Sequence, residues 1–197
     1  MQILHAILSQ KKAQKAGVPV TSKKLRALIQ CALFAALMAL GAWITVPFGQ
    51  IGFTMQTFVL FLTLGLLGGQ KGCAACTVYL LLGAVGLPVF HGFQGGAGVL
   101  LGPTGGYLAG FLAASAVYGV VTALLGRKLW VKGLAMVLGC LTCYAFGTLW
   151  FFLAYTGGAG LSLGAVLAKC VLPYLLPDTL KLALALALTG KLSRFCR

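Results

Sequence analysis

The stretch PTGGYLAGFLAASAVYGVVTALLG, from Pro103 to Gly126, contains no charged side chain and is followed directly by Arg127 and Lys128. An α-helix needs about 20 apolar residues to cross the roughly 30 Å of hydrocarbon in a bilayer. The stretch is long enough and apolar enough to do so. It therefore predicts a membrane-spanning helix that begins near Pro103 and ends at Gly126.

The rest of the chain has the same character. Of its 197 residues, 60% are hydrophobic and 8% are charged, and the mean hydropathy is +1.02. A soluble domain carries about 25% charged residues, so most of this surface must face lipid. The apolar runs are continuous over about 18–25 residues and do not alternate as the strands of a barrel do. The sequence thus predicts an all-α membrane protein.

The hydropathy pattern predicts six transmembrane helices in a single domain over residues 25–197. The last span is preceded by a partial helix at Leu161–Lys169, and residues 1–24 form a basic leader that lacks the apolar core of a signal peptide. The predicted spans are Leu25–Val46, Ile51–Gly68, Gly72–Phe90, Pro103–Gly126, Gly133–Tyr155 and Pro173–Thr189.

The positive charges predict the orientation of these spans. The chain has 15 Lys and Arg residues against one acidic residue, and all of them except Lys169 and Lys181 fall on one side of the predicted topology. Basic residues concentrate on the cytoplasmic side of membrane proteins, so both termini are expected to be cytoplasmic and the leader to lie near the lipid surface. Basic patches interleaved with aromatic residues, as in nucleic-acid-binding proteins, are missing from the sequence, and we expect no nucleic-acid partner.

Patterns typical of enzymes are missing from the sequence. A single carboxylate excludes a mechanism with paired acids, and a P-loop motif for ATP does not occur. Two cysteine pairs, Cys73-x-x-Cys76 and Cys140-x-x-Cys143, lie in or beside apolar helical runs. There, cysteine packs as a small hydrophobic residue, so we expect neither a metal site nor a cofactor in this chain.

The only acidic residue, Asp178, lies inside the last predicted span together with Lys181. Residues three apart share one face of a helix, and Asp178 lies roughly 20 Å from Lys191 at the inner end of that span. A charge at this depth usually faces a cavity or a partner. The pair either binds a ligand or only neutralises itself inside the bundle. Pro173 and Pro177 favour the first interpretation because they loosen the helix beside Asp178.

Other polar residues of the spans either contact a ligand or bond to neighbouring helices. They are Thr54, Gln56, Thr57, Tyr79, Thr104, Tyr107 and Tyr144. The glycine-rich loop His91–Gly102 is either a fold over a cavity or a flexible connector. Small-residue stripes in the first span offer a docking surface for another membrane subunit or serve internal packing; they are Ala32-x-x-x-Ala36 and Ala35-x-x-x-Ala39.

The motif LGPTGGYLAGF, from Leu101 to Phe111, resembles the hallmark of the BioY family, the biotin-specific substrate-binding subunits of energy-coupling-factor transporters. Four shorter motifs are similar to others of that family, and the resemblance covers about residues 25–190. Met55 and Thr179 depart from the expected pattern. The four motifs are VPF (46–48), FTMQT (53–57), GLPVF (86–90) and PDTLK (177–181).

The resemblance implies a subunit of the bacterial cytoplasmic membrane that captures biotin from outside and has no catalytic activity of its own. It would dock through the alanine stripes (Ala32, Ala35, Ala36 and Ala39) onto a transmembrane coupling subunit that carries two ATPases, which use the ATP. It also implies that Asp178 and Lys181 lie at the biotin site.

Biotin offers polar groups at both ends and an apolar ring between them. Asp178 is expected to accept from the ureido N–H groups, and Lys181 to donate to the ureido oxygen or to the carboxylate tail. Gln56 and Thr104 are expected polar contacts, and Tyr79, Tyr107 and Phe93 are expected to pack on the rings. The alternatives are a site for another small vitamin, an ion- or proton-coupled carrier based on Asp178, and a scaffold without a ligand.

Overall fold

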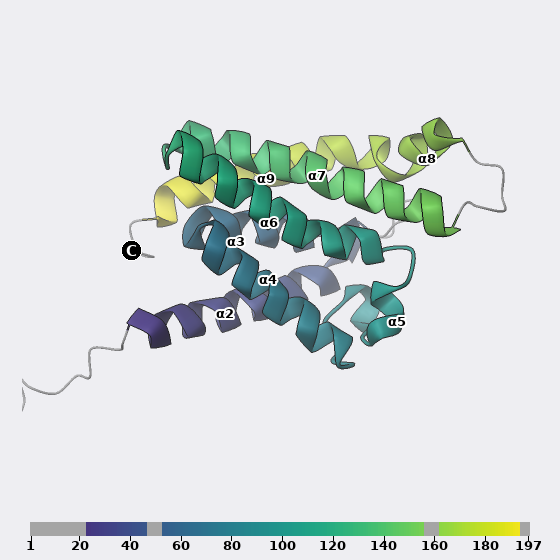
Figure 1. The fold of residues 1–197 in the computed structure, drawn as a ribbon, viewed down its shortest axis with the longest axis horizontal. Coiled ribbons are helices and arrows are strands. Elements are labelled where there is room, and N and C mark those ends of the chain that lie inside the picture. The colour runs from purple at the N-terminus through teal and green to yellow at the C-terminus, as the bar shows by residue number, and fades with distance from the viewer. Residues whose placement is uncertain (1–22, 47–52, 156–161, 194–197) are drawn as a thin grey trace, which may run out of the picture.

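The computed structural model describes residues 23–46, 53–155 and 162–193, which form a layered bundle of helices (Figure 1). A two-stranded antiparallel sheet, β1 (Thr45–Val46) with β2 (Phe53–Thr54), joins the first two helices. The helices are α2 (Lys23–Trp43), α3 (Gln56–Leu67), α4 (Gly69–Ala84), η1 (His91–Phe93), α5 (Ala97–Leu100), α6 (Gly105–Leu125), α7 (Leu129–Tyr155), α8 (Leu163–Cys170) and α9 (Leu172–Leu192).

Four helices of the described residues, α2, α6, α7 and α9, are long and apolar enough to cross a membrane. The predictions for the fourth and sixth spans are confirmed to within about three residues, and α8 confirms the partial helix within the described residues. The fifth span is longer than predicted and begins at Leu129. The second and third spans are wrong in length, because α3 has only 12 residues and α4 only 16.

The first predicted span ends in strand β1 and the second begins with strand β2, where the sequence predicted helix. Val46 pairs with Phe53 and Thr45 pairs with Thr54. Two features of the sequence explain the change. The run Ile44-Thr45-Val46 is β-branched and favours extended backbone, and Val46 precedes a proline, which disfavours the α conformation.

The segment between α4 and α6 folds back against α4, as the cavity-covering interpretation of the glycine loop expects. Shortly after the end of α4, Gly86 adopts a φ of 102°, which turns the backbone away from the helix direction. The backbone N–H of Gly96 then donates to the carbonyl oxygen of Gly83 at 2.7 Å, and Phe90 forms a β-bridge with Gln94.

Glycines allow α6 and α7 to pack closely as an antiparallel pair (Figure 1). A Cβ on Gly106 would lie 2.2 Å from the Cβ of Trp150, and a Cβ on Gly147 would lie 2.2 Å from the ring of Tyr107. The Gly106-x-x-x-Gly110 motif therefore serves helix packing. This packing brings the start of α6 against α7 and places Tyr107 in the interior.

The bundle has two distinct ends. The basic end, where α3 meets α4, α6 meets α7, and α9 finishes, carries Lys71, Arg127, Lys128 and Lys191. The loop end carries the β1–β2 pair, η1, α5 and α8, and lies at the right of Figure 1. The predicted leader lies outside the described residues, except that α2 already begins at Lys23.

Candidate functional site

The last helix places an ion pair inside the bundle. Lys181 Nζ lies 2.8 Å from Asp178 Oδ1, and the two residues are 5% and 6% exposed. They are three residues apart on α9, so both project from one face of that helix, as the spacing predicted. Burial of both charges is tolerated because each has the other as a partner.

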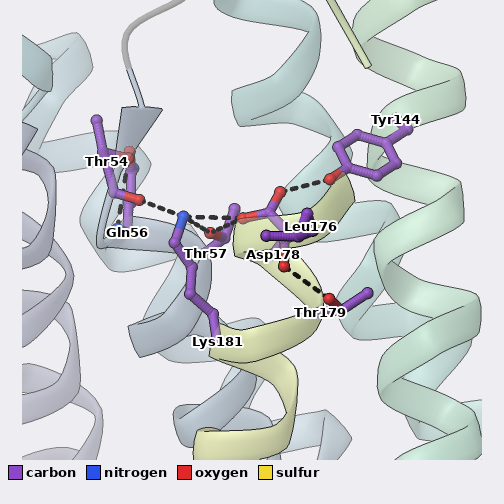
Figure 2. A network of polar contacts seen from close by, with 8 residues as sticks. All are labelled: Thr54, Gln56, Thr57, Tyr144, Leu176, Asp178, Thr179 and Lys181. Carbon is purple, nitrogen blue, oxygen red and sulfur yellow. Dashed lines mark hydrogen bonds and ion pairs between the residues drawn. The ribbon is translucent and has the colours of Figure 1, made fainter. Parts of the chain in front are cut away.

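Three acceptors surround the ammonium group of Lys181 (Figure 2). It donates to the backbone oxygen of Thr54 at 2.7 Å, to Thr57 Oγ1 at 3.0 Å and to Asp178 Oδ1. An ammonium group has three hydrogens, so these acceptors use its full donor capacity. The ring of Phe53 also faces it, with 3.6 Å between Nζ and the ring centroid, in a cation–π contact.

The carboxylate of Asp178 is held from two more sides (Figure 2). Tyr144, on α7, donates its hydroxyl to Oδ2 at 2.5 Å, and Thr57, on α3, donates to Oδ1 at 3.3 Å. With Lys181, these are three donors for a group that has about four lone-pair positions. The carboxylate thus retains capacity for one further donor.

The ion pair lines a cavity at the loop end, enclosed by α3, α6, α7, α9 and the segment after α4. The cavity and its open mouth together hold about 930 Å³ that no atom fills, a volume that includes the solvent space at the mouth. Most of its wall is apolar or aromatic, with few polar groups. The aromatic lining residues are Phe53, Phe61, Phe90, Tyr107, Phe111, Tyr144 and Tyr174.

Two contacts fasten the loop end beside this cavity. The indole N–H of Trp43, at the end of α2, donates to the carbonyl oxygen of Pro88 at 2.9 Å. Thr45 Oγ1 and His91 Nδ1 lie 2.9 Å apart. Both contacts join the α2–β1 segment to the loop that follows α4, which contributes His91 and other residues to the cavity wall.

Five of the predicted ligand residues come together in this cavity: Gln56, Thr104, Tyr107, Asp178 and Lys181. The hydroxyl of Tyr107 is buried next to the side chains of Thr148 and Cys170.

Two other predicted ligand residues are not among those lining the cavity. Tyr79 is fully buried behind Gln56, accepts a hydrogen bond from its side chain at 2.6 Å and donates to the carbonyl oxygen of Val89 at 3.0 Å. Phe93 is 64% exposed and stacks on Trp43, with 4.9 Å between ring centroids. The structure therefore makes Tyr79 a support for Gln56 and places Phe93 at the rim.

The alanine stripes of α2 divide into an inner and an outer pair. Ala35 and Ala39 are buried at 1% and 5% exposure and pack in the core. Ala32 and Ala36 are exposed. Of the four alanines predicted to dock a partner, only Ala32 and Ala36 are exposed and so accessible to another protein.

The prediction missed several residues at the site. Thr57 and Tyr144 were recognised as polar residues within spans, but nothing in the sequence connected them to Asp178. Phe53 was part of a recognised motif, yet its aromatic contact with Lys181 follows from β2, which was predicted as helix. Cys140 and Cys143 are buried, as packing predicts, and also line the cavity.

Comparisons with known proteins agree with this geometry. The BioY family model matches residues 10–197. A "Biotin transporter BioY" of Thermotoga maritima is 50% identical over 97 residues, which cover 49% of this chain and 57% of that protein. A "Probable biotin transporter BioY" of Pyrococcus horikoshii is 37% identical over 161 residues, which cover 82% of this chain and 92% of that protein.

A solved structure shares the fold. It is the crystal structure of the S-component for biotin from an ECF-type ABC transporter, with a TM-score of 0.76 and 22% identity, covering 90% of this chain and 95% of that one. The sequence match over most of the chain, with the matching fold, leads to one conclusion: this chain belongs to the BioY family.

Proposed function

We propose that this chain binds biotin in the loop-end cavity and is the substrate-binding subunit of an energy-coupling-factor transporter. As a member of its family it is a multi-pass protein of the cytoplasmic membrane and not an enzyme. The observation that carries the proposal is the buried Asp178–Lys181 pair in the wall of a largely apolar cavity.

The chemistry of the cavity fits biotin. Asp178 has capacity for one more donor, which an N–H of the ureido ring supplies. Lys181 has no donor left, so an acceptor on the ligand reaches it only by replacing the oxygen of Thr54 or Thr57. Tyr107 and the other aromatic residues of the wall suit the thioether ring.

The topology that suits this function has six crossings, with α2, α3, α4, α6, α7 and α9 in the domain of residues 25–197 and a basic leader at 1–24. Because α3 and α4 are short, the β1–β2 strands and the loop after α4 supply the remaining length of these two crossings at the loop end. The basic end then faces the cytoplasm by the positive-inside rule, which puts both termini there and opens the cavity to the outside.

Transport in this proposal requires partners. Ala32 and Ala36 lie on the exposed face of α2 beside Leu28, Ile29 and Leu33, which are 67%, 55% and 55% exposed. Small residues on such a face allow close helix contact, and we assign this face to the transmembrane coupling subunit. Two ATPases bound to that subunit use the ATP, and this chain needs no cofactor.

The test is biotin affinity of the purified protein. We expect tight binding that other vitamins do not displace, and a loss on the order of 30-fold or more in Asp178→Asn and in Lys181→Ala, because breaking a buried charge pair costs about 2–5 kcal/mol. Lys169→Ala, an exposed lysine of α8, is the matched control and should bind normally. Unchanged affinity in both pair variants would refute the site.

The same experiment separates the alternatives. Stronger binding of another vitamin would keep the transporter class and change the ligand. Uptake into vesicles driven by a pH gradient without ATPases would favour a carrier based on Asp178. A folded protein that binds no vitamin would contradict the proposed function.

A further inference from the structure

Two cavities lie side by side at the basic end, at the opposite end of the bundle from the biotin site. Both are lined by Leu66, Arg127 and Lys132. One cavity is also lined by Tyr118 and by the residues at the start of α4. The other is also lined by Thr189 of α9. We call these residues the basic-end cluster: Tyr118, Arg127, Lys132, Thr189 and the N-terminus of α4 at Gly69.

Two hydroxyl groups in this cluster are buried without a hydrogen-bond partner among the described residues. Tyr118 is 1% exposed and Thr189 is 0% exposed. A buried hydroxyl without a partner is energetically unfavourable. Both residues line the cavities, and the hydroxyl of Thr189 lies where α9 packs against Gly65 of α3.

Two cations stand beside these hydroxyls. Arg127 follows α6 directly and lines both cavities, one of them together with Tyr118. Lys132, on α7, donates to the carbonyl oxygen of Gly65 at 2.9 Å. The only acidic side chain of the sequence is Asp178, about 16 Å along α9 from Thr189. That carboxylate already forms an ion pair with Lys181.

The N-terminus of α4 adds further donors. Gly68 precedes the helix and provides no side-chain cap, so the first backbone N–H groups of α4 lack a helical acceptor. Glycines hold this terminus against α6, because a Cβ on Gly69 would lie 2.3 Å from the Cα of Gly119. The terminus thus lies next to Tyr118, and a helix N-terminus favours an anion.

We propose that the basic-end cluster binds a phosphate group. The cluster combines a guanidinium, an ammonium, two hydroxyls and helix N–H groups, which are all donors suited to phosphate oxygens. Leu124, Leu125 and Leu129 are exposed around it at 79%, 53% and 49%. This apolar rim suits a phospholipid whose headgroup carries the phosphate, and free phosphate offers the same chemistry. Basic pockets between transmembrane helices bind anionic lipids in this way.

The test measures thermal stability of the purified, biotin-loaded protein in neutral detergent. One arm adds phosphatidylglycerol or, for comparison, phosphatidylcholine; the other adds sodium phosphate or sodium chloride at equal ionic strength. We expect the Tm to rise by about 4 °C or more with the phosphate ligand. A rise with phosphatidylglycerol alone identifies a lipid headgroup, and a rise with sodium phosphate identifies free phosphate.

Variants locate the effect. Tyr118→Phe removes one oxygen and Arg127→Gln removes one exposed charge, and each should lose at least half of the rise. Lys128→Gln removes a neighbouring charge from a residue that lines neither cavity and should keep the rise. All three should bind biotin as the unmodified protein does.

Two results would overturn the proposal. The first is a wild-type protein whose Tm responds neither to the anionic lipid nor to phosphate, a result that depends on no variant. The second is an equal loss in Lys128→Gln and Arg127→Gln, which would mean a diffuse charge effect.

Discussion

Two lysines hold the two ends of α3, and they do so in different surroundings. Lys181 donates to the oxygen of Thr54, just before α3 begins, and Lys132 donates to the oxygen of Gly65 in its last turn. Lys181 is buried and has a carboxylate beside it. Lys132 is half-buried at the basic end, where the sequence supplies no acidic side chain.

The difference shows that a lysine's need for a counter-ion depends on its depth in the bundle. Deep in the bundle a lysine requires a counter-ion, because the cost of removing it from water is large. Near the basic end, water and anionic headgroups are within reach of the ammonium. The single acidic residue therefore lies where its absence would cost most, and this is also where the cavity lies.

The largest effect should come from separating the buried pair. Asp178→Leu leaves Lys181 buried without a counter-ion and should destabilise the protein by about 3–5 kcal/mol, whereas Asp178→Leu/Lys181→Met should be much less destabilised. Both should lose biotin binding. Thermal unfolding in detergent and biotin affinity measure the two properties. A double variant as unstable as the sum of its single changes would contradict the pairing.

A smaller effect is expected from Tyr144→Phe, which removes the donor to Asp178 Oδ2. Hydrogen bonds to charged groups contribute about 1.5–3 kcal/mol, so both the Tm and the biotin affinity should fall. Thr142→Val removes a hydroxyl from the same helix that bonds only to the oxygen of Leu138 and serves as the control. Equal effects of the two substitutions would show that Tyr144 does not support the site.

The smallest effect should follow Lys132→Met. The carbonyl oxygen of Gly65 loses its donor, at a cost of about 1 kcal/mol, because water can reach this end of the bundle. Biotin affinity should stay within about twofold of the unmodified protein, in contrast to Lys181→Ala. Titration with biotin and a thermal melt check both statements, and a large loss of affinity would mean that the two ends of α3 are coupled.

Much of the fold was predictable because hydrophobic length alone defines a membrane helix. The bounds of α6 and α9 followed from apolar runs that end at glycine and basic residues. The β1–β2 pair was not predictable in this way: the β-branched run before Pro47 favours extended backbone, but the pairing of Thr45 with Thr54 is what fixes both strands. That pairing is tertiary, and apolar residues on either side of it satisfy a helix pattern as well.

The site was predictable where a residue type is rare. One acid and one lysine inside a span are conspicuous, and their spacing gives their shared face. The contribution of Thr54 is a backbone carbonyl, which no side-chain pattern reveals. The two phenylalanines Phe53 and Phe93 were indistinguishable by sequence, and only β2 and a φ of 58° at Phe93 decide which one faces the lysine.

The shortness of α3 sets the distance that remains for a ligand. Its 12 residues span about 18 Å, and the acceptors for Lys181 lie at its first turn. A molecule held at Asp178 has therefore already passed the strand layer and sits part of the way through the protein. Between Asp178 and the basic end, buried side chains such as Leu64 and Met136 fill the core beside α3, so further passage inward requires these side chains to separate.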